Sequence, residues 1–157
     1  MFKKILLPVD GSLGSSLAVE YCLELLQNIS AHKVTLMNIT EMPSQLQSYS
    51  GKMGRVYNQI KEQLEVHGEE ILRKEAARFT EKKLPVIVET KLVWGDPPYS
   101  IVREAREGGY DLIIMGSRGL SGLESFLLGS ISNHVVQHAE CTVIIVKKKS
   151  KCLKGSV

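Results

Sequence analysis

Long apolar runs are missing from this 157-residue chain. No apolar stretch reaches the roughly 18 residues that a membrane-spanning helix needs. The apolar segment near the N-terminus, Ile5 to Val9, is short for a secretory signal peptide and is followed by an acidic residue. These absences argue against membrane-spanning and secreted classes of protein. We expect a cytoplasmic protein.

Cysteines are few, odd in number, and share neither a CxxC motif nor a zinc-like spacing. Cys22 falls on an apolar stripe of an expected helix, which predicts a reduced thiol in the core. His134 and His138 are four residues apart with Cys141 close behind, and only Glu140 stands near enough to complete a ligand set. This pattern gives little support for a zinc site.

The chain also has no large excess of either positive or negative charge, because its formal net charge is +3. Much of the excess lies in a lysine-rich tail that begins at about residue 148. No aromatic residue stands between these lysines to give a base a stacking platform. We expect a solvated terminus, with no nucleic-acid or membrane partner.

Hydrophobic residues make up 43% of the chain, enough for a single sizeable core. Apolar runs alternate with helical patterns, and no repeat or linker divides residues 1–157, which we predict to be one domain. The expected strands cover residues 3–9, 33–39, 86–93, 112–115 and 142–146. The expected helices run from a cap at Ser15–Ser16 to Ile29, from about 57 to 83 with a weak point at Gly68, between Pro98 and Gly108, and from about 130 to 138.

Strands that alternate with helices predict an α/β fold, with a parallel sheet covered on both faces and right-handed crossovers. For five strands we predict a doubly wound sheet in the order 3-2-1-4-5. The ligand crevice then lies at the carboxyl ends of strands one and four, where the winding direction reverses. This topology brings Pro8, Val9 and Asp10 beside Met115 and Gly116.

A glycine pattern follows the apolar run of strand four. The run ends at Gly116, Gly119 follows, and after nine further residues Gly129-Ser130 opens a helix. Glycines let backbone N–H groups approach an anion, and a helix N-terminus adds unpaired donors and partial positive charge. The spacing is neither that of a Walker A loop nor that of a Rossmann turn. It nevertheless predicts a phosphate-binding site.

This pattern, with Asp111 ahead of the apolar run, resembles the nucleotide-binding signature of the universal stress protein family, in its ATP-binding branch. The resemblance extends from KKILLPVDGS, through the GDP after Trp94, to CTVIIVK. It implies an adenine nucleotide alpha hydrolase-like fold that binds ATP and magnesium. It also implies a role as a nucleotide-dependent switch or stress-response module.

The resemblance assigns two groups of residues to the phosphates, beside the first glycine, Gly116. The loop that faces the phosphates consists of Ser117, Arg118 and Gly119. The helix start that holds them from the other side consists of Gly129, Ser130, Ile131 and Ser132. Hydroxyls at Ser130 and Ser132 and the guanidinium of Arg118 suit this role chemically.

The resemblance places Asp10 near the ribose and phosphates. There it could help hold magnesium through water, since a lone carboxylate is a poor magnesium site without phosphate oxygens. A local Asx-turn within Asp10-Gly11-Ser12 is an equally weighted alternative for this carboxylate. The residues that by resemblance wall the adenine are Pro8, Val9, Ile39 and Met115. Core packing at these four positions is compatible with that role.

The outer strand, Thr142 to Val146, would present an apolar edge that favours association, and the resemblance implies a homodimer formed through it. A polar stretch from Thr40 to Arg55 is expected to be either a lid or disordered. The sequence has no GxSxG elbow, no Ser/His/Asp pattern and no residue clearly placed to orient water. We therefore expect a binding protein, with slow ATP hydrolysis, or binding of AMP or a cyclic nucleotide, as alternatives.

Overall fold

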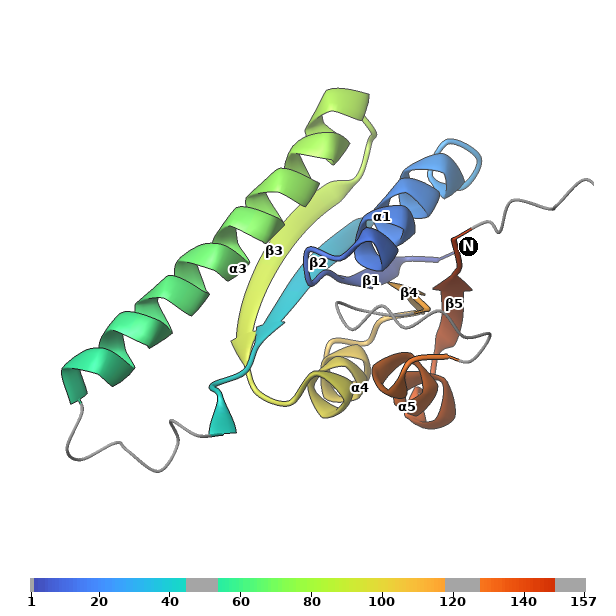
Figure 1. Cartoon of the computed structure of the whole chain (residues 1–157). Helices are drawn as coiled ribbons and strands as arrows, with labels where there is room; N and C mark the ends of the chain where they lie inside the picture. The colour runs from blue at the N-terminus through green and yellow to red at the C-terminus, as the bar shows by residue number, and fades with distance from the viewer. Residues whose placement is uncertain (1, 45–53, 118–127, 149–157) are drawn as a thin grey trace, which may run out of the picture.

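The computed structural model describes residues 2–44, 54–117 and 128–148 of the chain. Its centre is a five-stranded parallel sheet in the order β3-β2-β1-β4-β5, which confirms the predicted order (Figure 1). The strands are β1 Lys4–Pro8, β2 Lys33–Thr40, β3 Ile87–Trp94, β4 Leu112–Gly116 and β5 Thr142–Val146. The basic tail from residue 149 and most of the predicted 40–55 loop lie outside the described residues.

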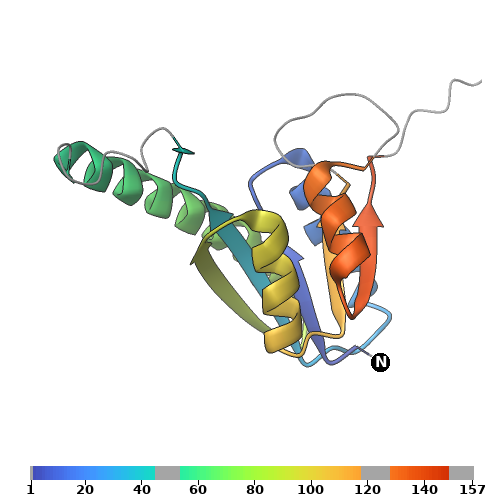
Figure 2. The ribbon, with the colours of Figure 1, turned by 90° about the horizontal axis from the view of Figure 1, so that it is seen from below.

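Helices cover both faces of this sheet (Figures 1 and 2). They are α1 Leu13–Leu25, α3 Gly54–Lys82, α4 Pro97–Glu107 and α5 Ser130–His138. Side chains on α1 and α3 share one core with one face of the sheet, and those on α4 and α5 share a second core with the other face. Neighbouring residues of β1 show the division, since Leu7 belongs to the first core and Leu6 to the second.

The central strands are apolar on both faces because helices cover both sides of them. Every residue of β4 is buried, and so are all residues of β1 after Lys4. The edge strands β3 and β5 are more exposed. In the part of the chain that the structure describes, no helix is both long and apolar enough to cross a membrane.

The start of α1 differs from the prediction. Ser12 is the N-cap, and its Oγ accepts a hydrogen bond from the backbone N–H of Ser15 at 3.2 Å. The predicted cap at Ser15–Ser16 is therefore wrong. Gly11 explains the earlier start, because its φ of +80° lets the chain turn sharply after β1. The helix ends at Leu25, so Ile29 is not part of it.

At Gly68, α3 packs closely on the sheet. A Cβ at this position would lie 2.4 Å from Leu92 Cδ1 and 2.6 Å from Asn38 Oδ1. Glycine is therefore a requirement for close packing here, although it is a weak helix former. All the buried residues of α3 lie from Gly68 onward, and the N-terminal half of the helix projects past the sheet (Figures 1 and 2).

Candidate functional site

A pocket opens at the carboxyl end of the sheet, beside β1 and β4, where the winding direction reverses. Its volume of about 330 Å³ is at the lower end of the range for small-molecule sites, about 300–1,000 Å³. The ends of strands and the starts of helices α1, α4 and α5 supply its walls. The lining residues are Pro8, Val9, Asp10, Ser12, Ser15, Ile39, Glu41, Pro97, Ile101, Met115, Gly116, Gly129, Ser130, Ile131 and Ser132.

The pocket brings together most of the residues that the sequence singled out. The ends of β1 and β4 meet in it although they are far apart in the chain, and the start of α5 forms a further wall. Ser117 directly follows β4 and is not part of the lining. Arg118 and Gly119 lie outside the described residues.

Asp10 lines this pocket and lies two residues after β1 ends. Its Oδ1 accepts a hydrogen bond from the backbone N–H of Ser12 at 2.9 Å, which is the Asx-turn considered from the sequence. A carboxylate has about four lone-pair sites, so this bond leaves acceptor capacity for a ligand or a hydrated ion. The local role and a binding role are compatible.

The two helices that begin beside Asp10 and Gly116 differ at their N-termini. The Ser12 side chain caps α1. Helix α5 begins after Gly129. This N-cap residue has no side chain that could accept a hydrogen bond from the first turn. The backbone N–H groups of Ser130, Ile131 and Ser132 have no acceptor within their own helix. Of these two helix starts, that of α5 therefore leaves more backbone donors available to an anion.

The hydroxyl of Ser132 serves the protein itself. Its Oγ lies 2.8 Å from the carbonyl oxygen of Ser117 and 3.0 Å from that of Gly129, and it can donate to either. The backbone N–H of Gly129 also donates to Ser117 O at 2.9 Å. These bonds fix the start of α5 against the end of β4, so the donors of α5 are held at the pocket.

Gly116 is needed for space as well as for access to the pocket. A Cβ on this residue would lie 2.5 Å from the carbonyl carbon of Gly14 and 2.7 Å from its oxygen. The first turn of α1 thus packs against the end of β4, backbone to backbone. Only glycine at 116 permits this approach.

Five lining residues were not predicted from the sequence: Ser12, Ser15, Glu41, Pro97 and Ile101. Four of them immediately follow a strand or belong to the start of a helix, so the rule that ligands bind at the carboxyl edge of such sheets could have found them. Among the described lining residues, Asp10 and Glu41 carry negative charge and no Lys or Arg balances them. A cation that accompanies a polyanion would offset part of the repulsion from these two carboxylates.

Asp111, which precedes β4, lies at the other end of that strand from the pocket. Its Oδ2 accepts hydrogen bonds from the backbone N–H groups of Lys3 at 2.7 Å and Lys4 at 2.8 Å. These backbone donors, that of Lys4 foremost, lower the pKa of the Asp111 carboxyl. Asp111 therefore holds the start of β1 beside β4 and takes no part in the pocket.

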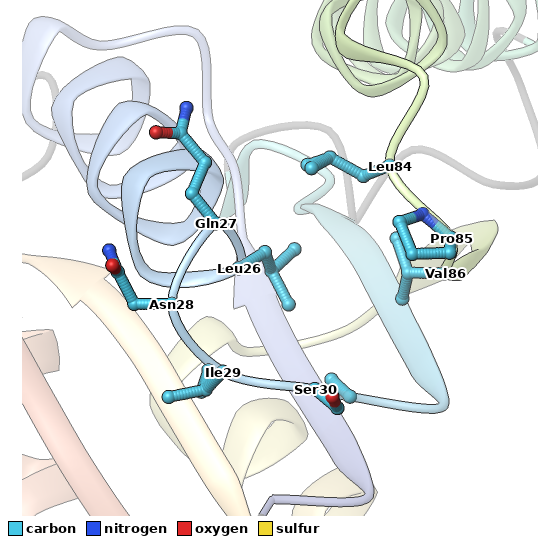
Figure 3. A pocket seen from close by; sticks show the side chains of 9 residues that line it. Leu26, Gln27, Asn28, Ile29, Ser30, Leu84, Pro85 and Val86 are labelled. Carbon is cyan, nitrogen blue, oxygen red and sulfur yellow. The ribbon is translucent and has the colours of Figure 1, made fainter.

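A second pocket, of about 230 Å³, lies at the opposite end of the sheet (Figure 3). It is formed by the turn after α1, residues 26–31, and the turn after α3, residues 84–86. None of these nine residues carries an ionisable side chain. This pocket offers no charge to hold a phosphate, and we do not assign a nucleotide to it.

The sequence also matches known proteins. A family model described as "Universal stress protein family" matches residues 1–147. Universal stress protein MJ0531 of Methanocaldococcus jannaschii is 31% identical over 151 residues, which cover 96% of this chain and 85% of that protein. Universal stress protein YxiE of Bacillus subtilis is 32% identical over 153 residues, which cover 94% of this chain and 100% of that protein.

Solved structures share the fold. Hypothetical protein MJ0577 superposes with a TM-score of 0.78 at 30% identity, covering 96% of this chain and 99% of that chain. A universal stress protein in complex with cAMP gives a TM-score of 0.66 at 24% identity, and the match covers 92% of this chain and 97% of that chain. A universal stress protein family protein of Arabidopsis thaliana with AMP bound gives a TM-score of 0.68 at 20% identity. The match covers 94% of this chain and 93% of that chain. At these two lower identities the likeness concerns the fold alone.

Proposed function

The chain belongs to the universal stress protein family, and on that premise we propose that it binds ATP with magnesium in the pocket between β1 and β4. Binding would make the protein a nucleotide-dependent switch in a stress response. The observation that carries this proposal is the start of α5, which no side chain of the described residues caps and which lines the same pocket as Asp10. Phosphate groups suit such a helix end because it offers unpaired N–H donors and partial positive charge.

The other part of the pocket suits a base. Pro8, Val9, Ile39 and Met115 contribute apolar surface where the strands end. A purine buries its flat faces against such side chains, while backbone groups at the strand ends can bond its edge. We propose that the adenine lies here, with its phosphates directed toward Ser130.

Magnesium follows from the charges in the lining. Asp10 and Glu41 would repel a triphosphate, and a divalent cation bound to phosphate oxygens would reduce that repulsion. Magnesium usually keeps several waters and binds through one or two carboxylates together with substrate phosphates. We propose that Asp10 contacts the ion through water.

A nucleotide with fewer phosphates is the second candidate. The two more distant structures carry cAMP and AMP, and the volume of about 330 Å³ is small for a ligand site. Such ligands carry less charge, so their binding would depend less on magnesium than that of ATP. The metal dependence of affinity therefore separates the candidates.

Calorimetric titration of the purified protein with ATP, AMP and cAMP, each with and without magnesium, tests the proposal. We expect ATP to bind most tightly and to lose most affinity when magnesium is removed, with GTP as the control for the base. Tighter binding of AMP or cAMP would transfer the proposal to that ligand. No binding of any adenine nucleotide would refute it. Phosphate release by the wild type and by Asp10→Asn tests slow hydrolysis.

We further propose a homodimer in the cytoplasm. Strand β5 is an outer strand of the sheet, and four of its five residues are only partly buried. Pairing β5 with its copy across a two-fold axis would cover this edge in both subunits. The thiols of Cys22 and Cys141 are free, which suits a reducing compartment. A monomer in sedimentation velocity at micromolar concentration would contradict the dimer.

A further inference from the structure

Asn38 is a buried polar residue on the face of β2 that α3 covers. Only 5% of its surface is exposed, and its side chain makes two hydrogen bonds. Its Nδ2 donates to the carbonyl oxygen of Val9 at 2.7 Å, and its Oδ1 accepts from Thr40 Oγ1 at 3.2 Å. Such a satisfied amide inside a core fixes its partners in one arrangement.

The bond to Val9 lies where β1 leaves the sheet. The last paired residues of the two strands are Pro8 and Met37, and the N–H of Val9 still donates to Met37 O at 2.8 Å. Beyond this point the chain turns toward Ser12. The Asn38 side chain thus adds one hydrogen bond between β2 and the chain that follows β1, at the carbonyl of Val9 immediately before Asp10.

The peptide unit that joins Val9 to Asp10 is held at both edges. Asn38 binds its carbonyl oxygen, and the N–H of Asp10 points to Ser15 Oγ at 3.4 Å, a long contact. Because the peptide is planar, fixing the carbonyl fixes the direction in which the chain enters Asp10. The shorter of the two bonds comes from Asn38, so this residue provides the firmer hold.

Helix α3 leaves Asn38 no room to move. A Cβ on Gly68 would lie 2.6 Å from Asn38 Oδ1 and 3.3 Å from Thr40 Oγ1, so the helix backbone packs directly on this pair. A turn of the amide toward α3 would therefore meet the backbone of the helix at Gly68. With only 5% of its surface exposed, Asn38 also has little access to water that could replace a lost hydrogen bond.

We propose that Asn38 is a positioning residue of the nucleotide pocket, which holds the Val9 carbonyl and so sets the direction of Asp10. This inference rests on the proposed function, because Val9 and Asp10 matter for binding only if the pocket takes a nucleotide. Asn38 itself is not among the lining residues. Its effect on binding passes through the backbone.

The test compares Asn38→Leu, which keeps the approximate size and removes the donor, with two controls. Thr40→Val removes the other hydrogen bond of Asn38 and leaves the bond to Val9. Tyr110→Phe removes a buried hydrogen bond to Thr35 in the second core. For each protein, ATP affinity with magnesium, urea unfolding, and the amide NMR signals of Asp10 and Ser12 without ligand are measured.

We expect Asn38→Leu to weaken ATP binding by about tenfold or more and to move the Asp10 and Ser12 signals. Both controls should bind within about twofold of the wild type despite some loss of stability. Wild-type affinity and unmoved signals in Asn38→Leu would overturn the proposal, as would an equal loss of affinity in all three variants. If Asn38→Leu does not fold, Asn38→Ser, whose hydroxyl is too short to reach Val9 O, takes its place with the same expected results.

The readouts separate this inference from the proposed function. If the wild type binds no adenine nucleotide, the proposed function fails, while the NMR signals of the unliganded variants still report on Asn38. Movement of the Ser12 signal in the Asn38 variant alone would then show that Asn38 positions Asp10, because the Ser12 N–H donates to the Asp10 carboxylate, whereas the Asp10 amide shares its peptide unit with the Val9 carbonyl. Unmoved signals would refute it.

Discussion

Placing a capping side chain at Gly129 should stabilise α5 and weaken nucleotide binding. Gly129 has φ −64° and ψ 159°, an extended conformation that any residue can adopt, so the backbone does not require glycine there. Asp and Asn are preferred at this position because their side-chain oxygen accepts a hydrogen bond from a first-turn N–H. Gly129→Asp and Gly129→Asn should each raise the free energy of unfolding by a few tenths of a kcal/mol.

The same hydrogen bond removes a donor from the phosphates. A hydrogen bond to a charged group contributes about 1.5–3 kcal/mol, so losing one should raise the Kd for ATP by roughly 10- to 150-fold. Gly129→Asp should lose more affinity than Gly129→Asn, because its charge also repels the phosphates. Gly129→Ala adds a methyl group without a cap and should stay closer to the wild type in affinity.

Calorimetry with ATP and magnesium, together with urea unfolding of each variant, gives the two quantities. The reasoning requires opposite changes in Gly129→Asn and Gly129→Asp, with stability up and affinity down, and a loss of affinity that grows in the order Ala, Asn, Asp. Wild-type affinity in Gly129→Asp would refute the assignment of phosphates to α5. An equal loss in Gly129→Ala would show that space alone, and not the open helix end, accounts for the effect.

Three further predictions concern stability and pH. Gly68→Ala should lower the free energy of unfolding by about 1–3 kcal/mol in urea although alanine favours helices, whereas Gly54→Ala, whose Cβ meets nothing within 4 Å, should show no loss. Arg78→Met should cost about 3–5 kcal/mol, because it leaves the buried carboxylate of Glu75 without the guanidinium at 2.8 Å, and adding Glu75→Gln should restore most of this. The pKa of Asp111 is lowered by its backbone hydrogen bonds, so its contribution to stability is complete above the unfolded-state pKa of about 3.9 and is lost as the pH falls through the lower folded-state pKa. Thermal unfolding at a series of acidic pH values should show a smaller loss of stability for Asp111→Asn, and an unchanged acid profile would contradict this role.

The order of the sheet could be predicted because the apolar runs are unambiguous. Leu112 to Met115 is apolar at every position, as a strand with helices on both faces must be, and the alternation with helices leaves few topologies. The start of α1 could not, because Ser12, Ser15 and Ser16 are all suitable caps in the sequence. The turn at Gly11, with its positive φ, selects Ser12.

In the pocket, the glycine spacing and the switch-point rule located Asp10 and Gly116. The requirement that Gly116 meet the backbone of Gly14 could not be read from the sequence, because it depends on how closely α1 approaches β4. The sequence also contains no pattern that marks Asn38 as a residue that supports the pocket. A single polar residue in a strand reads as a solvated position until α3 is seen to cover it.

Crystallography of the protein with ATP and magnesium tests the central claim most directly. We predict density for the phosphates against the backbone N–H groups that follow Gly129, with the adenine between Val9 and Ile39 and the metal ion on the side of Asp10. A nucleotide bound elsewhere, such as in the pocket formed by residues 26–31 and 84–86, would contradict the account. So would crystals grown at saturating nucleotide in which the pocket at Asp10 holds only water.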